Sequence, residues 1–482
     1  MTETMSYPSN RPAWFLLTRH CLSLVGTALV TTAAISWLFV LPLHMRGHVD
    51  NPYVGIIVFL ILPIIFFTGL ALIPLGIYLS KRNIQKGLEE PDFDRKAALQ
   101  RLAWFFGVTT GLNILIGTQV TYRAVKHMET PQFCGGTCHS MSPELAAYQN
   151  SPHSRLECVE CHVAPGAAGW IESKTAGTRQ LIETVFDTYR RPIPSAVESN
   201  RLVPARETCE NCHWPQKFAG VILRVVNKYA EDESSTRTQS VLLMMVGGNK
   251  ITGIHGAHLG PGVHIRFATA DATRHTIPWV EYRNTATGDA KTFVSSESTA
   301  DSVKGLPTYE MQCVDCHNRP THTFDLPERA VDKALALGDV AVTLPYIKKQ
   351  SVELLKADYR SNKEATDKLP AALVSFYQQN YPDLYAKRSQ DITQAGQAIL
   401  AIYNRNVFPD LKVSWGTYAN NLGHMDFPGC FRCHDGSHTT TDGKTITQDC
   451  NTCHEPLAMD EATPEILKTL GIAERISKVQ KQ

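Results

Sequence analysis

The feature that most constrains this 482-residue chain is a set of six cysteine pairs, each followed directly by histidine. Twelve of the thirteen cysteines belong to these pairs, and only Cys21 stands alone, inside an apolar run. A disulfide framework gives no reason to place histidine after every second cysteine. The pattern therefore predicts repeated sites for one kind of prosthetic group.

Five of the pairs have two residues between the cysteines. Two thiols three positions apart on a helical turn can both reach the vinyl groups of a haem, and the next residue presents an imidazole to the iron. A lone motif could instead bind zinc, but five in one chain favour covalent haem. The five sites are Cys158-Val-Glu-Cys161-His162, Cys209-Glu-Asn-Cys212-His213, Cys313-Val-Asp-Cys316-His317, Cys430-Phe-Arg-Cys433-His434 and Cys450-Asn-Thr-Cys453-His454.

The remaining pair is Cys134-Gly-Gly-Thr-Cys138-His139, with three residues between the thiols. Its two glycines make the wider loop easy to accommodate, because glycine adopts conformations closed to other residues. We interpret it as another attachment site. The sequence thus predicts six covalent haem c groups.

Each low-spin haem takes a second axial ligand, and the histidines outside the motifs are numerous enough for bis-histidine ligation of most haems. Any one of them could instead be an ordinary surface residue. In the group formed by His255, His258 and His264 we expect one haem ligand, with His255 and His258 as first candidates; this group could also bind another metal. The candidates closest to a motif are His153, His322, His424 and His438.

Three uncharged stretches are long enough to cross a bilayer core, which takes about 20 apolar residues. They are residues 21–43, 53–79 and 102–122. The first is longer than the roughly 7–15-residue apolar region of a signal peptide and lacks a small-residue cleavage site. We therefore expect three transmembrane helices.

The basic residues give an orientation. The segment between the second and third stretches carries Lys81, Arg82, Lys86, Arg95, Lys96 and Arg101, whereas the one after the first carries only Arg46. The positive-inside rule places the tail 1–20 and this basic segment in the cytoplasm. The haem region then lies in the periplasm, anchored to a bacterial inner membrane by several passes.

The expected fold is mainly α with little regular structure, because closely spaced haems must themselves form much of the packing centre. Alternating strand-like runs predict a small β insertion. The expected regions are 123–227 with haems one to three, 228–300 as the β insertion, 301–415 with haem four and a helical segment, 416–460 as a C-terminal dihaem segment, and a tail at 461–482.

The formal net charge of +1 gives no sign of a nucleic-acid partner. Six haems would add roughly twelve propionate charges. The holoprotein would then be acidic, and a basic redox partner is expected.

From Leu102 to Arg190 the sequence resembles the NapC/NirT family of membrane-anchored multihaem quinol dehydrogenases. The resemblance is carried by Phe133-Cys-Gly-Gly-Thr-Cys-His-Ser-Met141, then Ser151-Pro-His153. It implies that Met141 ligates or contacts the first haem near the quinol site, and that His153 ligates a later haem. In the NrfH branch a lysine twelve residues after the second motif ligates the second haem, a role that would fall on Lys174.

The later motifs resemble the larger, ImcH-like branch, which passes quinol electrons to periplasmic or extracellular acceptors. There are departures. Small members have one anchor helix and four haems, and Leu181 stands where the NrfH branch has an acidic residue seven after the lysine. Candidates for the proton acceptor are Glu183, Asp187 and Glu129.

These features favour a quinol:cytochrome c-type oxidoreductase of anaerobic respiration. Quinol from the membrane pool would be oxidised at the membrane surface, beside the first haem and where the third stretch ends at Arg123, Lys126, His127 and Glu129. Electrons would leave from the last two haems to a periplasmic or outer-membrane cytochrome or reductase. Two alternatives stay open, a terminal reductase of a small oxyanion such as nitrite and a wiring subunit of a larger membrane complex; a homo-oligomer is a further possibility.

Overall fold

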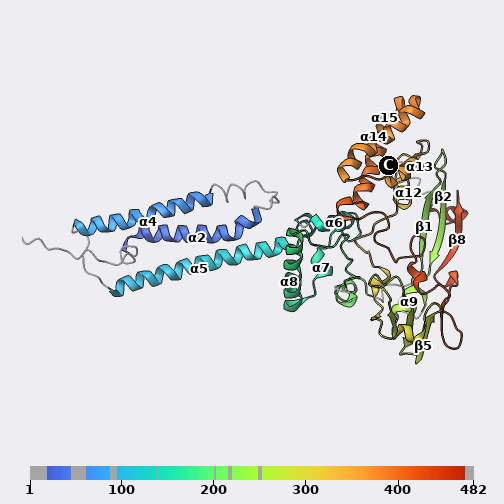
Figure 1. Cartoon of the computed structure of the whole chain (residues 1–482), viewed down its shortest axis with the longest axis horizontal. Coiled ribbons are helices and arrows are strands. Elements are labelled where there is room, and N and C mark those ends of the chain that lie inside the picture. The colour runs from blue at the N-terminus through green and yellow to red at the C-terminus, as the bar shows by residue number, and fades with distance from the viewer. Residues whose placement is uncertain are drawn as a thin grey trace, which may run out of the picture. The chain divides into compact units, whose positions relative to one another are not determined.

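The computed structural model describes residues 19–44, 61–86, 95–137, 139–199, 202–214, 220–247 and 252–472. The chain divides into two compact units, Met1–Glu129 and Thr130–Gln482. Figure 1 labels the elements of both. The fold is mainly helical, with two small sheets.

The described part of the N-terminal unit contains three long helices, α2 (Cys21–His44), α4 (Leu62–Gln85) and α5 (Arg95–Met128). Helices α2 and α4 approach closely at small residues. A Cβ added to Gly26 would lie 2.6 Å from the Gly69 carbonyl oxygen, and one added to Gly76 would lie 2.5 Å from the Ser23 nitrogen. Small residues of this kind let helices pack tightly in membranes.

One described helix, α4, is long and apolar enough to cross a membrane. In α2 the described apolar part is the shorter segment Cys21–Trp37. Helix α5 has the length but carries polar side chains such as Asn113 and Gln119 within its apolar stretch. The expectation of three membrane spans is therefore supported for one helix only. That expectation rested on the absence of charged residues, and a stretch without charges can still contain uncharged polar side chains. Residues 1–18 of the expected tail and 53–60 of the second expected span lie outside the described residues.

The C-terminal unit contains two antiparallel sheets. The three-stranded sheet has the order β1-β2-β8, and the five-stranded sheet has the order β6-β3-β4-β5-β7. The strands are β1 (Ile222–Tyr229), β2 (Arg237–Met244), β3 (Val263–Ala268), β4 (Trp279–Asn284), β5 (Asp289–Ser295), β6 (Thr308–Glu310), β7 (His438–Thr439) and β8 (His454–Glu461). Each sheet thus recruits a strand from the last two motifs.

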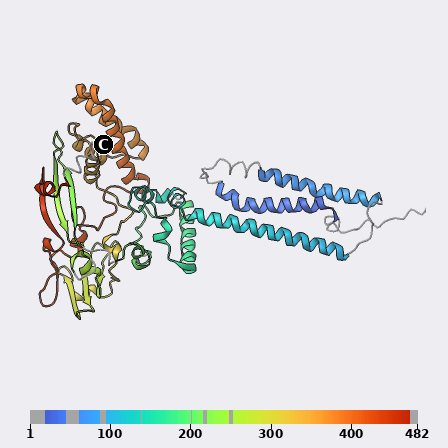
Figure 2. The ribbon, with the colours of Figure 1, turned by 180° about the vertical axis from the view of Figure 1, so that it is seen from behind.

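Four helices form the largest apolar core: α12 (Pro327–Leu337), α13 (Ile347–Lys356), α14 (Asn362–Asn380) and α15 (Pro382–Asn406). Leu355, Leu369 and Tyr377 are fully buried within it. Asp332 of α12 accepts a hydrogen bond from the Tyr229 backbone nitrogen, at 3.1 Å. This bond ties α12 to β1, beside which α12 lies in Figure 1; Figure 2 shows the same unit from behind.

The remaining elements, apart from the 20-residue helix α8, are short, and several of them contain motif residues. They are η2 (Gln132–Thr137), η3 (His139–Met141), α6 (Ser142–Gln149), α7 (Cys158–His162), α8 (Gly166–Val185), η4 (Ala205–Glu207), η5 (Cys209–Asn211), α9 (Gly253–Leu259), α10 (Ala300–Val303), α11 (Cys313–Cys316), η7 (Pro409–Leu411), η8 (Gly429–Arg432), η9 (Cys450–Thr452) and α16 (Glu465–Thr469). Around these elements the chain has little regular structure of its own.

Candidate haem-binding sites

Each of the five regular motifs begins a short helical turn, in α7, η5, α11, η8 and η9. The turn is closed by a hydrogen bond from the motif histidine nitrogen to the first cysteine carbonyl, at 2.8 Å for His213, 2.7 Å for His317 and 3.0 Å for His434. This turn places two thiols and an imidazole on one side of the backbone, as covalent haem attachment requires.

Five motif histidines each face a histidine from elsewhere in the chain. A metal–imidazole bond is about 2 Å long, so two imidazoles on opposite sides of one iron have ring centroids about 6 Å apart. The observed centroid distances are 6.3 Å for His162 and His322, 5.9 Å for His213 and His153, 6.2 Å for His317 and His255, 5.8 Å for His434 and His258, and 6.1 Å for His454 and His424. The spacing fits a haem iron between each pair.

Hydrogen bonds orient several of these rings. The Nδ1 atom of His322 lies 3.0 Å from the Glu144 carbonyl oxygen, that of His258 lies 2.7 Å from the Ile254 carbonyl, and that of His434 lies 2.7 Å from the Thr447 carbonyl. An Nδ1–H that donates to a carbonyl leaves the Nε2 lone pair for a metal. The donor set therefore fits haem iron.

Burial keeps these imidazoles neutral, which is the form that binds a metal. Burial lowers the pKa of His322 to about 4, and the nearby His162 adds to the shift. Burial also lowers the pKa of His258 and of His317. These rings are ready to ligate at neutral pH without losing a proton.

Both candidate ligands of the 255–264 group that face a motif lie on one short helix, α9. Its first turn is fixed to the end of β2, because the Ile254 nitrogen donates to the Met245 carbonyl at 2.8 Å and the His255 nitrogen donates to the Val246 carbonyl at 2.9 Å. His255 faces the fourth motif and His258 faces the fifth. We had expected one ligand in this group, and the geometry offers two.

His438 does not face a motif histidine. Its ring is 1% exposed, with Nε2 2.7 Å from the Ile277 carbonyl oxygen and Nδ1 2.9 Å from Asp435 Oδ1. Both ring nitrogens have protein partners, so the expectation that His438 ligates an iron is not supported. His264, on β3, instead lies 3.0 Å from Glu310.

We expected Lys174 to ligate the second haem. His322, which follows the fourth motif in sequence, occupies the position opposite His162. The Nζ atom of Lys174 lies 5.6 Å from the centre of the Trp170 ring. A hydrogen bond with Cys158 raises the pKa of Cys134, and the charge of Lys174 acts in the opposite direction. Lys174 thus lies near the first motif, and its role at the second haem stays a prediction.

The motifs adjoin one another in the order of the sequence. The Cys134 and Cys158 thiols share a hydrogen bond, so the first motif adjoins the second. Burial raises the pKa of Cys161 and of Cys313, and the charge of Cys209 raises both further, so the third motif adjoins the second and the fourth. Burial likewise raises the pKa of Cys316 and of Cys453, with Cys430 as a common neighbour that raises both. The fifth motif therefore adjoins the fourth and the sixth.

The residues proposed for quinol chemistry are distributed over both units. Arg123, Lys126 and His127 lie in the last turns of α5, and Glu129 follows them at the end of the N-terminal unit. In the C-terminal unit, Met141 ends η3. On α8, Glu183 is 3.1 Å from Arg179, and just beyond that helix Asp187 pairs with Arg191. These two carboxylates have a neutralising partner.

A buried carboxyl group that the sequence did not single out is Glu144. It is 8% exposed, and its Oε2 atom has no hydrogen-bond partner among the described residues. Burial raises the pKa of Glu144 to about 7, and the charge of Arg319 opposes that shift. Its nearness to Met141 in sequence was the one signal available.

Comparison with known proteins supports the haem interpretation. The model of the NapC/NirT cytochrome c family, N-terminal region, matches residues 96–206. The chain is 36% identical over 455 residues to the cytochrome c-type protein ImcH of Geobacter sulfurreducens, which covers 92% of this chain and 89% of that protein.

Two shorter relatives match about a fifth of the chain. The cytochrome c-type protein NrfH of Wolinella succinogenes is 26% identical over 111 residues, 22% of this chain and 60% of its own length. The cytochrome c-type protein TorC of Escherichia coli K12 is 27% identical over 124 residues, 22% of this chain and 30% of its own length. No solved structure matches the chain.

Proposed function

Because this chain belongs to the NapC/NirT cytochrome c family, we propose that it is a membrane-bound hexahaem cytochrome that oxidises quinol and passes the electrons to a periplasmic or extracellular acceptor protein. The family makes it a multihaem c-type cytochrome. The number of haems, the quinol substrate and the acceptor are the parts that we propose.

The observation that carries this proposal is the set of five facing histidine pairs, in which each motif is matched by one ligand from a distant segment. Bound haem c supplies one-electron acceptors. Two imidazoles on each iron leave no open position for a substrate at these five sites. The arrangement therefore favours electron transfer over a terminal reductase of nitrite or another oxyanion.

The order of the motifs in space supports a path from the first site to the last. Thiols of successive motifs are close enough to affect one another's ionisation, from Cys134 through to Cys453. We propose that quinol is oxidised near the first motif and that electrons leave near the fifth and sixth. A basic cytochrome is the expected acceptor.

At the quinol end, the chain has to bind a hydroxyl-bearing ring and accept two protons. We propose that Met141 and Lys174 border this site, because Lys174 lies close enough to lower the pKa of Cys134 in the first motif. Glu144 is buried, and its Oε2 atom has no hydrogen-bond partner among the described residues. It joins Glu129, Glu183 and Asp187 as a candidate proton acceptor. The groups at the end of α5, from Arg123 to His127, are candidates for contact with quinol or lipid headgroups.

Helix α4 supports anchoring in a membrane. We propose that the motif region faces the periplasm of the inner membrane, on the side where haem is attached to cytochromes c, and that α2 and α5 also cross. The topology can be tested by introducing a cysteine as Arg46→Cys or Leu88→Cys and labelling intact cells. If three helices cross the membrane as proposed, only the cysteine at position 46 is accessible from outside.

Anaerobic mixing of the purified protein with a short-chain quinol tests the proposal. The proposal expects reduction of the c-type absorption bands without any other protein. If an intact, fully haem-loaded preparation is not reduced, a wiring subunit supplied by a separate quinol-oxidising partner becomes the better description.

A further inference from the structure

Charged side chains between the fourth and fifth motifs form a buried network that electron transfer alone does not explain. Asp315 lies between the cysteines of the fourth motif and Arg432 lies between those of the fifth. Arg274 donates from Nη1 to Asp315 Oδ1 at 2.7 Å, and these side chains are only 9% and 3% exposed. The other carboxylate oxygen accepts from the Gln312 backbone nitrogen at 2.8 Å.

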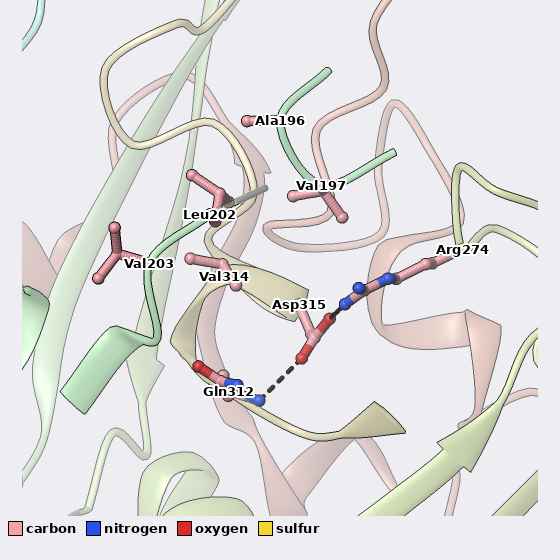
Figure 3. A pocket seen from close by; sticks show the side chains of 8 residues that line it. All are labelled: Ala196, Val197, Leu202, Val203, Arg274, Gln312, Val314 and Asp315. Carbon is pink, nitrogen blue, oxygen red and sulfur yellow. Dashed lines mark hydrogen bonds and ion pairs between the residues drawn. The ribbon is translucent and has the colours of Figure 1, made fainter. Parts of the chain in front are cut away.

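Figure 3 shows the Arg274–Asp315 pair beside a small cavity of about 50 Å³. Apolar side chains, including Leu202, Val203 and Val314, line the rest of it. A charged pair in such surroundings gains much more from its mutual attraction than an exposed pair does. Removal of either partner would leave the charge of the other buried and unpaired, which is strongly destabilising.

Arg432 connects the fourth motif to the fifth. Its guanidinium donates from Nη2 to the Asp315 carbonyl oxygen at 2.6 Å and from Nη1 to the Arg274 carbonyl oxygen at 2.8 Å. Its Nε donates to the Gly429 carbonyl at 2.9 Å. One rigid fork therefore holds the backbone of both motifs.

The network carries two positive charges and one negative charge, a net charge of +1. Asp435, an acidic group of the fifth motif, has a side chain that is 36% exposed and pairs with His438. Arg274 also stacks on Tyr309, with its Cζ atom 3.8 Å from the ring centre. The excess positive charge, on the partly buried Arg432, thus lies beside the cysteines of both motifs.

Arg432 lies next to an attachment cysteine of each motif. It directly precedes Cys433 in the chain, and it bonds to the carbonyl of Asp315, which directly precedes Cys316. A positive charge close to a redox centre favours the more electron-rich, reduced state of that centre.

We propose that Arg432, supported by Arg274 and Asp315, is a positioning residue that fixes the fourth and fifth haem sites relative to each other and raises the reduction potential of both. The inference rests on the proposed assignment of haems to these motifs. Neighbouring charge, hydrogen bonding and burial are the means by which a protein sets haem potentials. Raised potentials at these sites would draw electrons away from the quinol end.

A spectroelectrochemical titration of the purified holoprotein, with wild type and Arg432→Gln compared, tests the inference. We expect two of the six haems to shift to lower potential by at least a tenfold change in the oxidised-to-reduced ratio, about 59 mV for a one-electron couple. The other four are expected to keep their potentials. The matched control is Arg329→Gln, which breaks a partly exposed ion pair with Asp426 and is expected to shift none.

Arg432→Lys separates charge from packing, because it keeps the charge and loses the fork. We expect it to retain the wild-type potentials, and this variant decides the matter if Arg432→Gln loses haem. An unchanged titration in Arg432→Gln, an equal shift of all haems, or a downward shift in Arg432→Lys would overturn the inference. Chemical titrants set the potentials here, so failure of quinol to reduce the wild type would count against the proposed function alone.

Discussion

Distal ligation depends on which ring nitrogen each histidine leaves available. His322 and His258 give their Nδ1 protons to backbone carbonyls, and each ring faces a motif histidine. His438 has both nitrogens engaged within the protein and packs in the interior instead. Two histidines that each lie a few residues after a motif, His322 and His438, can thus have different roles.

Whether His322 or Lys174 ligates the second haem can be tested directly. We expect His322→Ala to convert one haem from low spin to high spin, because His162 then lacks its facing ligand. Lys174→Gln is expected to leave the low-spin spectrum unchanged. Electron paramagnetic resonance of the oxidised proteins measures both. A high-spin signal in the lysine variant alone would show that Lys174, not His322, ligates the second haem.

A second residue-scale prediction concerns the buried ion pair of the helical core. Lys348 Nζ lies 2.6 Å from Asp332 Oδ1, and these side chains are 3% and 8% exposed. Lys348→Met leaves a buried carboxylate unpaired, so we expect a loss of about 3–5 kcal/mol in the free energy of unfolding. Lys363→Met, which removes a solvent-exposed partner of Asp367, is the control and is expected to leave thermal unfolding unchanged. Equal melting temperatures for the two variants would argue against the role of the buried pair.

At the scale of elements, α9 links three motifs. Its two histidines face the fourth and fifth motifs, and it follows β2, whose neighbour β8 begins at His454 of the sixth. The Met245 nitrogen donates to the Cys453 carbonyl at 2.9 Å. Ligands for two sites and the backbone of a third therefore depend on one short connection.

Gly253→Ala should disturb this connection. Gly253 has φ +72°, and an added Cβ would lie 2.7 Å from the Met245 carbonyl oxygen. We expect α9 to shift and two haems to lose their distal ligands together, seen as high-spin haem in the oxidised spectrum. The matched control is Gly288→Ala, which has φ +78° but nothing within 4 Å of the added Cβ. Loss of a single distal ligand, or of none, would contradict the joint role of α9.

The sequence offered a pool of candidate ligands, but it could not predict which motif each of them faces. Spacing along the chain identified His153, His322 and His424, since a ligand has to lie near some haem. It could not show that each serves a motif other than the nearest, because that depends on tertiary contacts between distant segments. The same limit applies to β7 and β8, because each pairs with a strand that comes much earlier in the sequence, β5 and β2 respectively.

At the scale of the whole molecule, the C-terminal unit has one conventional apolar core, in α12–α15, and smaller clusters elsewhere. The motif region has short turns and little regular structure, so its packing depends on the prosthetic groups. We expect a preparation made without haem attachment to lose the motif region to proteolysis while the helical segment around α14 and α15 resists. Limited proteolysis of the apoprotein with mass analysis of the fragments measures this, and equal resistance throughout would contradict it.

The central claim is that six haems are attached along this chain, and the intact mass of the purified holoprotein tests it most directly. The wild-type chain is expected to have the mass of the polypeptide plus six haem c groups. A variant with Cys134→Ala and Cys138→Ala is expected to carry five. A fully matured wild-type protein with five haems or fewer would contradict the account.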